Sequence, residues 1–331
     1  MTAAVSIDGG RFAITGGLSL LGERLTAHLL GGGAREVVLV DNFAFHPERT
    51  PADTGDVRTR LVRGDVRDGE TLRGAFAGID GVFHTAAFVT LPLSQDPMLG
   101  IDVNIRGTAT VLDAAAASGV RKVVLSSSVA VYGESLDAPI HETSPFRTSG
   151  LQPAAVLYGA SKLSAEALGE KAHRDHGLAV VSLRYSSLYD ESQRGRGLNA
   201  MHLWEVMQQM IEKRSPTIGA EPEETHDYLH SSDAARANLA AMRSTVASGS
   251  YTIATGRARR LDEAVRILSA LVDFPGDVDF DAGADRVRFS RSTNLQYDVD
   301  AARRDLGWKA DVDLEQGLAL LVEHTQRAKE S

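Results

Sequence analysis

The stretch Thr15-Gly16-Gly17-Leu18-Ser19-Leu20-Leu21-Gly22 follows a short apolar run, residues 12–15, and opens a helical pattern over residues 20–30. Glycine permits a tight turn and a close approach of backbone to ligand, and the following helix presents free N–H groups at its N-terminus. A glycine-rich strand–helix turn without a ligand is the simpler alternative. A strand, such a loop and a helix in this order are nevertheless typical of a fold that binds a dinucleotide.

Short apolar runs alternate with helical patterns through the first half of the chain. We expect strands at residues 12–15, 36–40, 60–63, 82–84, 122–125 and 179–185. Helices are expected over 20–30, 102–117 and 152–176, and later over 198–213, 232–244, 261–271, 299–306 and 314–327. This alternation predicts right-handed crossovers and a parallel sheet that helices cover on both faces.

The pattern loosens after about residue 186, which divides the expected fold into two parts. The predicted class is α/β, with a doubly wound parallel-sheet Rossmann domain and a smaller mixed α/β substrate-binding domain. We assign residues 1–186 and a returning segment of about 225–255 to the NAD-binding Rossmann domain. Residues 187–224 and 256–331 are assigned to the substrate-binding domain.

Composition narrows the class of protein. The chain has 331 residues, no cysteine and a formal net charge of −9, so a nucleic-acid or anionic-membrane partner is not expected. Disulfides and cysteine-based zinc sites are excluded. No signal peptide is visible at the N-terminus, and no apolar run reaches the roughly 18 residues of a membrane span. A cytoplasmic enzyme or sensor is the expectation.

Asp41 ends the second expected strand, nineteen residues after Gly22. An acidic side chain at this place can accept hydrogen bonds from the adenosine ribose hydroxyls, and it repels a 2′-phosphate. The following Asn42 and Phe43 supply no cation to neutralise one. A strand-end aspartate that caps a turn is the alternative. The pattern favours NAD over NADP as the cofactor.

Tyr158 and Lys162 stand four residues apart in an expected helix, and a serine run, Ser126-Ser127-Ser128, closes an apolar strand upstream. The spacing brings both side chains onto one helix face. A free tyrosine has a pKa near about 10, and a fixed ammonium beside it favours the phenolate. The alternative is a solvated helix with an ordinary tyrosine and lysine. The three groups together would form an acid/base device for an alcohol or ketone.

Taken together, these segments resemble the extended short-chain dehydrogenase/reductase family, and more narrowly its NAD-dependent epimerase/dehydratase group. Further motifs carry the resemblance: Gly64-Asp65-Val66-Arg67-Asp68, His84-Thr85-Ala86-Ala87, Asn104 in Asn-Ile-Arg-Gly-Thr, Ser128 in Ser-Ser-Ser-Val-Ala-Val-Tyr-Gly, and Asp305-Leu306-Gly307-Trp308. The resemblance implies an oxidoreductase or isomerase in which Ser128, Tyr158 and Lys162 are catalytic, and in which Asn104 supports the active-site architecture.

The resemblance also implies contacts with cofactor and substrate. The implied NAD contacts are Gly16, Ser19, Leu20, Leu21, Gly22, Asp41, Asn42, Phe43, Asp65, Val66, Thr85, Ala86, Ala87, Asn104, Ser126, Tyr158, Lys162, Tyr185 and Leu188. The implied substrate contacts are Val89, Ser128, Tyr158, Ser187, Asn199, His226 and Arg288.

Several positions depart from the family pattern. Ser19 replaces a glycine, Ser187 an asparagine, Asp190-Glu191 a Gly-Pro pair, and His226 an arginine that typically holds a diphosphate. No carboxylate follows Ser128, so elimination of water is not expected. His226 and His230 would lie roughly 13 Å apart on an extended strand, so we propose no metal site.

The leading hypothesis is an NAD-dependent epimerase or dehydrogenase that acts on a secondary alcohol of a sugar, with a nucleotide-linked substrate favoured. Two alternatives stay open: a simple dehydrogenase or ketoreductase of a non-nucleotide polyol or hydroxy substrate, and a non-catalytic dinucleotide-binding sensor. The resemblance further implies a homodimer, built from the helix of residues 102–117 and the helix that carries Tyr158. Alanine-rich stretches in both, residues 114–117 and 165–168, permit close helix packing, in the dimer or within the monomer.

Overall fold

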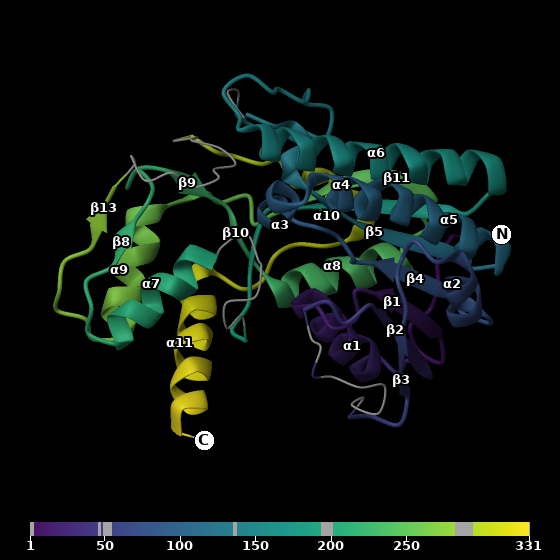
Figure 1. The fold of residues 1–331 in the computed structure, drawn as a ribbon, viewed down its shortest axis with the longest axis horizontal. Coiled ribbons are helices and arrows are strands. Elements are labelled where there is room, and N and C mark those ends of the chain that lie inside the picture. The colour runs from purple at the N-terminus through teal and green to yellow at the C-terminus, as the bar shows by residue number, and fades with distance from the viewer. Residues whose placement is uncertain are drawn as a thin grey trace.

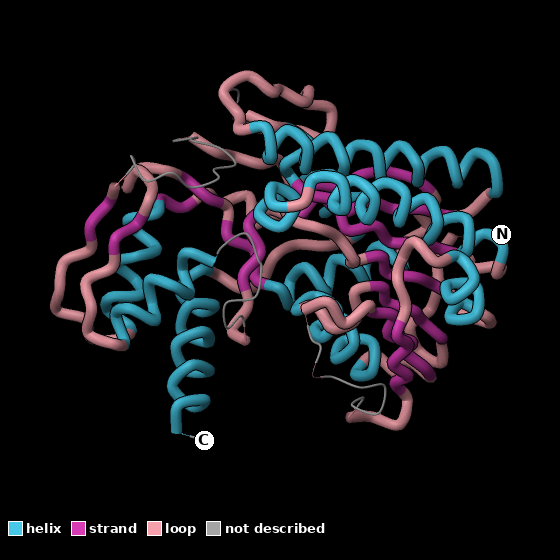
Figure 2. Tube along the Cα trace, viewed as in Figure 1, coloured by secondary structure: helices cyan, strands magenta, loops and turns pink. Residues whose placement is uncertain are grey.

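A computed structural model describes residues 3–45, 48, 55–134, 138–192, 201–281 and 294–330. Its centre is a parallel sheet of seven strands in the order β11-β6-β5-β4-β1-β2-β3 (Figures 1 and 2). The strands are β1 (Arg11–Thr15), β2 (Glu36–Asp41), β3 (Thr59–Arg63), β4 (Gly81–His84), β5 (Lys122–Ser128), β6 (Ala179–Tyr185) and β11 (Ser248–Ile253). The predicted parallel-sheet α/β class is confirmed.

Helices cover both faces of this sheet, because side chains of each strand alternate between two apolar cores. Phe12 and Ile14 of β1 enter one core with α1 (Leu20–Gly31) and α8 (Ser231–Arg243), whereas Ala13 enters the other. That second core contains α2 (Gly69–Phe76), α5 (Thr108–Ala117) and α6 (Pro153–His176). Figure 1 shows α5 and α6 on one side of the sheet, and α1 and α8 on the other.

The strand order reverses between β1 and β4, since β2 and β3 lie beyond β1 whereas β5 and β6 lie beyond β4. In open parallel sheets a ligand binds outside the carboxyl ends of the strands at such a reversal. The loop after β1 and the residues after β4 are therefore the first place to search for a site.

The helix expected over 102–117 is interrupted in the structure. The short helices α3 (Thr90–Gln95) and α4 (Pro97–Ile101) precede a π-helical segment, η1 (Asp102–Gly107), and regular α-helix begins only at Thr108. A π-helical turn holds an extra residue, and such turns are frequent at functional sites. Asn104 lies within this turn.

A second group of elements stands beside the sheet, to its left in Figure 1. It begins at the carboxyl end of β6, where β7 (Ser187–Tyr189) pairs in parallel with β10 (Tyr228–His230). The helices α7 (Met201–Ile211), α9 (Leu261–Leu271) and α11 (Leu314–Glu330) share an apolar core. Two short ladders complete it, β8 (Thr217–Ile218) with β13 (Asp279–Phe280) and β9 (Thr225–His226) with β12 (Arg259–Arg260).

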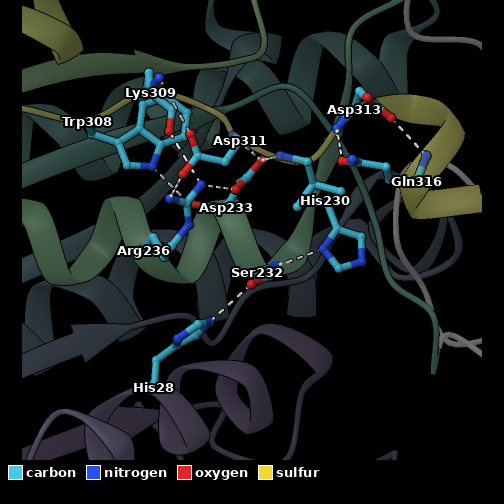
Figure 3. Close-up of polar contacts among 11 residues, drawn as sticks. His28, His230, Ser232, Asp233, Arg236, Trp308, Lys309, Asp311, Asp313 and Gln316 are labelled. Atoms are coloured by element: carbon cyan, nitrogen blue, oxygen red, sulfur yellow. Dashed lines mark hydrogen bonds and ion pairs between the residues drawn. The ribbon is translucent and has the colours of Figure 1, made fainter. Parts of the chain in front are cut away.

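The Leu-Gly-Trp segment joins the two groups of elements. Helix α10 (Asp300–Leu306) and Trp308 pack into the core that α8 shares with the sheet, and the Trp308 indole N–H donates to the carbonyl of Asp233, 3.1 Å away (Figure 3). The Asp233 carboxylate accepts the backbone N–H groups of Asp311 and Val312. The chain is thus attached to α8 just before it enters α11. The division into a cofactor-binding and a substrate-binding domain stays a prediction.

Among the described residues, no helix combines the length and the apolar character that a membrane crossing needs.

Candidate active site

The loop after β1 is shaped for close backbone contact with a ligand. Gly16 has φ +67°, and a Cβ atom on it would lie 2.9 Å from the backbone of Ala86. A Cβ on Gly22 would lie 2.6 Å from the Gly16 carbonyl oxygen. Both distances exclude a side chain, so the loop packs closely on Ala86 and turns tightly into the N-terminus of α1. This cradle fits a dinucleotide pyrophosphate.

Ser19, where the resemblance implies a glycine, is the N-cap of α1. Its hydroxyl accepts the N–H of Gly22 at 3.1 Å, a bond that a glycine could not make. Leu20 and Leu21 form the rest of the first turn. The serine therefore stabilises the helix start while it stands in the phosphate loop.

The carboxylate of Asp41 connects this loop to the end of β2. One oxygen accepts the N–H of Leu18 at 3.1 Å, and the other accepts the N–H of Phe43 at 2.8 Å. Phe43 has φ +64°, and the Arg63 guanidinium lies 4.0 Å from its ring centroid. The sequence analysis took only Asn42 and Phe43 as neighbours of Asp41. In the structure Arg63 is a further neighbour, because β3 pairs Arg63 with Asp41.

Asp65, after β3, is fixed by Arg67, whose guanidinium donates to both carboxylate oxygens at 2.8 and 2.7 Å. Hydrogen bonds from Arg67, and one from Asn42, hold the pKa of Asp65 below its ordinary value despite partial burial. Arg67 also bonds Asp102, at the start of the π-helical turn, at 2.9 Å. Val66 is buried beside them.

A directed hydrogen-bond chain runs from β1 to the π-helical turn. The Thr108 hydroxyl donates to the Asn104 carbonyl at 2.7 Å, so it must accept from His84 Nε2, which lies 3.0 Å away. His84 Nδ1 then accepts from the Thr15 hydroxyl at 2.6 Å. Burial, aided by the charge of Lys162, lowers the pKa of His84 to about 3, which fits this neutral form. Next to it, the Thr85 hydroxyl donates to the Thr15 carbonyl at 2.7 Å.

The Asn104 side chain bonds Phe88 and Ser161. Its oxygen accepts the N–H of Phe88 at 2.8 Å, and its nitrogen donates to the Phe88 carbonyl at 2.9 Å and to Ser161 Oγ at 3.1 Å. Ser161 lies on α6 between Tyr158 and Lys162. Asn104 therefore fixes the segment of Phe88 and Val89 against the helix that carries the tyrosine, next to Ala86 and Ala87.

The structure brings Ser126, Ser128, Tyr158 and Lys162 together where β5 meets α6. The Tyr158 hydroxyl is hydrogen-bonded to Ser128, whose oxygen also accepts the N–H of Ala130 at 3.1 Å. Lys162 Nζ donates to the Ser126 carbonyl at 2.8 Å and lies 5.8 Å from the Tyr158 ring centroid. Tyr158 and Lys162 lie in a predicted helix, whereas the two serines lie in the part of β5 that extends three residues beyond its predicted end.

Burial sets the protonation of this pair. It raises the pKa of Tyr158 to about 12, opposed by the Ser128 hydrogen bond. It lowers the pKa of Lys162 to about 8, opposed by the charge of Glu166. The isolated protein therefore holds a protonated phenol beside a lysine that loses its charge slightly above neutral pH. Lys162 can therefore exchange a proton in the range where enzymes act, whereas the phenol of the isolated protein stays protonated there.

The end of β6 adds three of the predicted residues. Tyr185 is paired with Ser128 in the β5–β6 ladder, and its hydroxyl accepts from Asn238 at 2.7 Å. Leu188 is buried on β7, and the N–H of Ser187 donates to the carbonyl of Asp227 at 2.9 Å. Two further residues, Asn199 and Arg288, lie outside the described residues.

The Asp190-Glu191 pair forms a charged cluster with the first helix. Arg24 of α1 donates to Asp190 at 3.0 Å and to Glu191 at 2.5 Å, and His230 Nε2 lies 2.9 Å from Glu191. His230 Nδ1 accepts the N–H of Ser232 at the start of α8, which leaves Nε2 as the donor to Glu191 (Figure 3). The cluster ties α1 to the carboxyl end of the β7–β10 ladder.

His226 lies in a group of aromatic rings within the second part of the molecule. Its ring centroid is 5.4 Å from those of His202 and Tyr228, and its Nε2 is 3.9 Å from a carboxylate oxygen of the buried Glu224. Burial lowers the pKa of His226 to about 4, so its imidazole is neutral at pH 7. A neutral ring beside a carboxylate is a weak anchor for an anion.

No group of three or more His, Asp or Glu side chains with metal-binding geometry occurs among the described residues. The sequence missed Glu166, which lies one turn beyond Lys162 and bonds four donors. It also missed Asp227, which accepts from Ser186 and Thr255 and from the backbone that follows Thr255. The four-residue spacing that runs from Tyr158 through Lys162 to Glu166 could have identified Glu166 from the sequence.

The fold and the glycine loop define a dinucleotide-binding α/β protein, and comparisons with known proteins narrow this class. The model of the NAD dependent epimerase/dehydratase family matches residues 12–254. The UDP-glucose 4-epimerase of Azospirillum brasilense is 31% identical over 90% of this chain and 86% of its own length. The dTDP-glucose 4,6-dehydratase of Streptomyces griseus is 31% identical over 93% of this chain and 92% of its own.

A solved structure, MoeE5 in complex with UDP-glucose and NAD, superposes with a TM-score of 0.82 at 28% identity, over 97% of this chain and 100% of that one. The chain belongs to the NAD-dependent epimerase/dehydratase family of extended short-chain dehydrogenases/reductases. It is an enzyme, and its cofactor is NAD.

Proposed function

We propose that this enzyme is an NAD-dependent epimerase or dehydrogenase that acts on a secondary alcohol of a nucleotide-linked sugar. The observation that carries the proposal is the contact of Tyr158 with Ser128 and of Lys162 with Ser126, at the carboxyl end of β5. Relatives whose printed names concern UDP-glucose and dTDP-glucose support the class of substrate.

Each side chain has a defined task. Tyr158 removes the proton of the substrate hydroxyl, and Ser128 donates a hydrogen bond to the same oxygen as it becomes a carbonyl. Lys162 carries its charge below about pH 8, which stabilises the phenolate, so the tyrosine can serve as a base although burial raises its pKa. When bound, NAD accepts the hydride from the substrate carbon.

The residues around the glycine loop would hold the cofactor. The first turn of α1, with Leu20 and Leu21, would bind the pyrophosphate, Asp41 the adenosine ribose, and Asp65 with Val66 the adenine. Lys162 would bind the nicotinamide ribose. The tight glycine turn at Gly16 and Gly22, which leads into the N-terminus of α1, supports this assignment.

Replacement of the tyrosine tests the proposed mechanism. Tyr158→Phe should lower the turnover of an NDP-sugar by about 10²- to 10⁴-fold, because the general acid/base is lost. Its NAD affinity, measured by calorimetry, should be close to that of the wild type. Tyr251→Phe, on β11, is the matched control and should leave the rate unchanged. Full activity of Tyr158→Phe would refute the mechanism.

Absorbance of NADH during turnover separates the two activities. An epimerase returns the hydride to the sugar, so isomer forms without net NADH, whereas a dehydrogenase accumulates NADH with product. The same assay with nucleotide-linked and free sugars tests the second candidate, a non-nucleotide polyol or hydroxy substrate. The neutral His226 beside Glu224 favours this candidate, since neither group attracts a diphosphate. The cytoplasmic location and the homodimer stay predictions of the sequence.

A further inference from the structure

Helix α6 faces three consecutive residues of β5 with three side chains at four-residue spacing. Tyr158 contacts Ser128, Lys162 contacts the Ser126 carbonyl, and Glu166 accepts from the Ser127 hydroxyl at 2.5 Å. Glu166 thus lies one helical turn beyond Tyr158 and Lys162, the pair to which the proposed function assigns the proton transfer. Glu166 holds the middle residue of the strand segment whose outer two residues hold Tyr158 and Lys162.

The Glu166 carboxylate is buried and fully engaged. Arg184 of β6 donates to its two oxygens at 2.9 and 2.7 Å, and Ser250 of β11 donates at 3.0 Å. Both side chains of the ion pair are only 10% exposed. One carboxylate therefore connects α6 to β5, β6 and β11, the three strands at one end of the sheet.

Arg184 extends the connection to the segment that follows Ser128. Its Nη1 donates to the Tyr132 hydroxyl at 3.1 Å and to the Glu142 carbonyl at 2.8 Å. Tyr132 ends the short 3₁₀ helix η2 (Val129–Tyr132), for which Ser128 is the N-cap. Both sides of Ser128 are thus fixed through the same ion pair, directly at Ser127 and indirectly at Tyr132.

We propose that Glu166 is a positioning residue, which fixes Ser126–Ser128 against α6 and so sets both the geometry of Tyr158 and Lys162 and the charge of the lysine. The inference rests on the proposed function of that pair. A buried carboxylate that only stabilised the fold would not need to bond the residue between the two contact points.

The charge of Glu166 affects the pKa of Lys162 in one direction only. The ionisable groups near Lys162 are Tyr158 and Glu166 on its own helix and His84 from β4, and Arg184 of β6 is ion-paired with Glu166. Glu166 favours the charged lysine. Removal of its charge leaves Arg184 as an uncompensated cation, so Lys162 should lose its proton at lower pH.

The test is Glu166→Gln, an isosteric change without charge. The midpoint of Lys162 titration, followed by its Cε resonance in protein labelled with ¹³C-lysine, should fall by about two units, the size expected for a unit charge one helical turn (about 6 Å) away at an effective dielectric of about 20. The alkaline limb of kcat/KM should move down by the same amount. The kcat should fall about tenfold as the tyrosine and serine lose their alignment.

Two further variants divide charge from position. Glu166→Gln combined with Arg184→Gln removes both charges, so the lysine midpoint should return towards the wild-type value while kcat stays low. Ser127→Ala deletes only the hydrogen bond to β5, and should lower kcat several-fold without a change in the midpoint, at the cost of a small fall in Tm. This variant keeps the test decisive if Glu166→Gln does not fold.

Asp233→Asn and Glu170→Gln serve as controls, the first a buried carboxylate of α8 paired with Arg236, the second an exposed carboxylate one turn further along α6. Neither should move the lysine midpoint, although Asp233→Asn should lower Tm. A Glu166→Gln protein with a lower Tm but an unchanged midpoint and pH profile would overturn the proposal. The NMR readout needs no turnover, so a failure of the tyrosine mechanism, seen with Tyr158→Phe, would be recognised separately.

Discussion

Lys162 is a buried charge that the fold tolerates at a cost. Burial lowers its pKa to about 8 from an ordinary 10.5. Between these values the unfolded chain binds more protons than the folded one, so the free energy of unfolding rises with pH in this window and is flat below pH 8. At pH 7 the difference of pKa corresponds to about 3 kcal/mol of destabilisation, an upper figure.

We therefore expect Lys162→Met to stabilise the protein while it abolishes activity. Loss of the hydrogen bond to the Ser126 carbonyl costs about 1 kcal/mol, so the net gain in the free energy of unfolding is about 2 kcal/mol at pH 7. Urea unfolding without added cofactor, at pH 7 and up to pH 10.5, measures it. The gain should vanish across that window; a variant that is less stable than the wild type at pH 7 would contradict the burial argument.

The positions of the tyrosine, the lysine and the serines could be predicted from sequence because two local patterns determine them. A four-residue spacing predicts that Tyr158 and Lys162 share a helix face, and a serine run at a strand end predicts hydroxyls beside them. Glu166 fits the same spacing, yet its partners Arg184 and Ser250 come from two other strands. Their approach depends on strand order, which no local pattern contains. The depressed pKa of His226 is equally a result of tertiary burial.

The charged cluster at the end of β7 holds together α1, β7 and β10. The sequence identified Asp190-Glu191 as a departure from Gly-Pro, but their cation, Arg24, lies 166 residues from Asp190 along the chain. Burial raises the pKa of Glu191, but the His230 hydrogen bond and the charge of Arg24 outweigh it and hold the value at about 2, below the ordinary 4.5. The resulting stability is present above pH 4.5 and is lost as pH falls towards 2.

Glu191→Gln should accordingly cost about 2 kcal/mol at pH 7, after allowance for partial exposure. The difference from the wild type should shrink as the pH of the urea unfolding experiment is lowered from 5 towards 3, because the unfolded-state carboxylate takes up its proton near pH 4.5 while the folded one stays charged. Glu323→Gln is the control, because its ion pair with Arg327 on α11 is exposed and should contribute little. A pH-independent cost would assign the effect to packing instead.

The sequence predicted the strands that are continuous apolar runs. It missed the strands that lack such a run and form only because they pair with a neighbouring strand. The six predicted strands of the sheet agree with β1–β6 to within three residues at each end. The seventh, β11, begins Ser-Gly-Ser and is a strand because it pairs with β6. The two-residue strands β8, β9, β12 and β13 have no pattern of their own. Their positions follow from packing around the second core.

The alanine-rich stretches that suggested a dimer are largely used inside one molecule. Ala114 and Ala115 are buried in the core between α5 and the sheet, and Ala165 is buried on α6. The neighbouring helices α3, α4 and α6 instead expose Leu91, Met98 and Leu157, at 55%, 77% and 37%. Exposed large apolar side chains on adjacent helices are candidates for burial between subunits.

A homodimer through α3, α4 and α6 predicts that charge on this face separates the subunits. Leu91→Glu combined with Met98→Glu should convert a dimer into a monomer in light scattering at micromolar concentration, because two carboxylates would be desolvated in each interface half. Leu320→Glu, an exposed leucine of α11 on the other part of the molecule, is the matched control and should leave the mass unchanged. Circular dichroism should show the same fold for all three proteins. A wild type that is already monomeric, or a double variant that stays dimeric, would exclude this face as the interface.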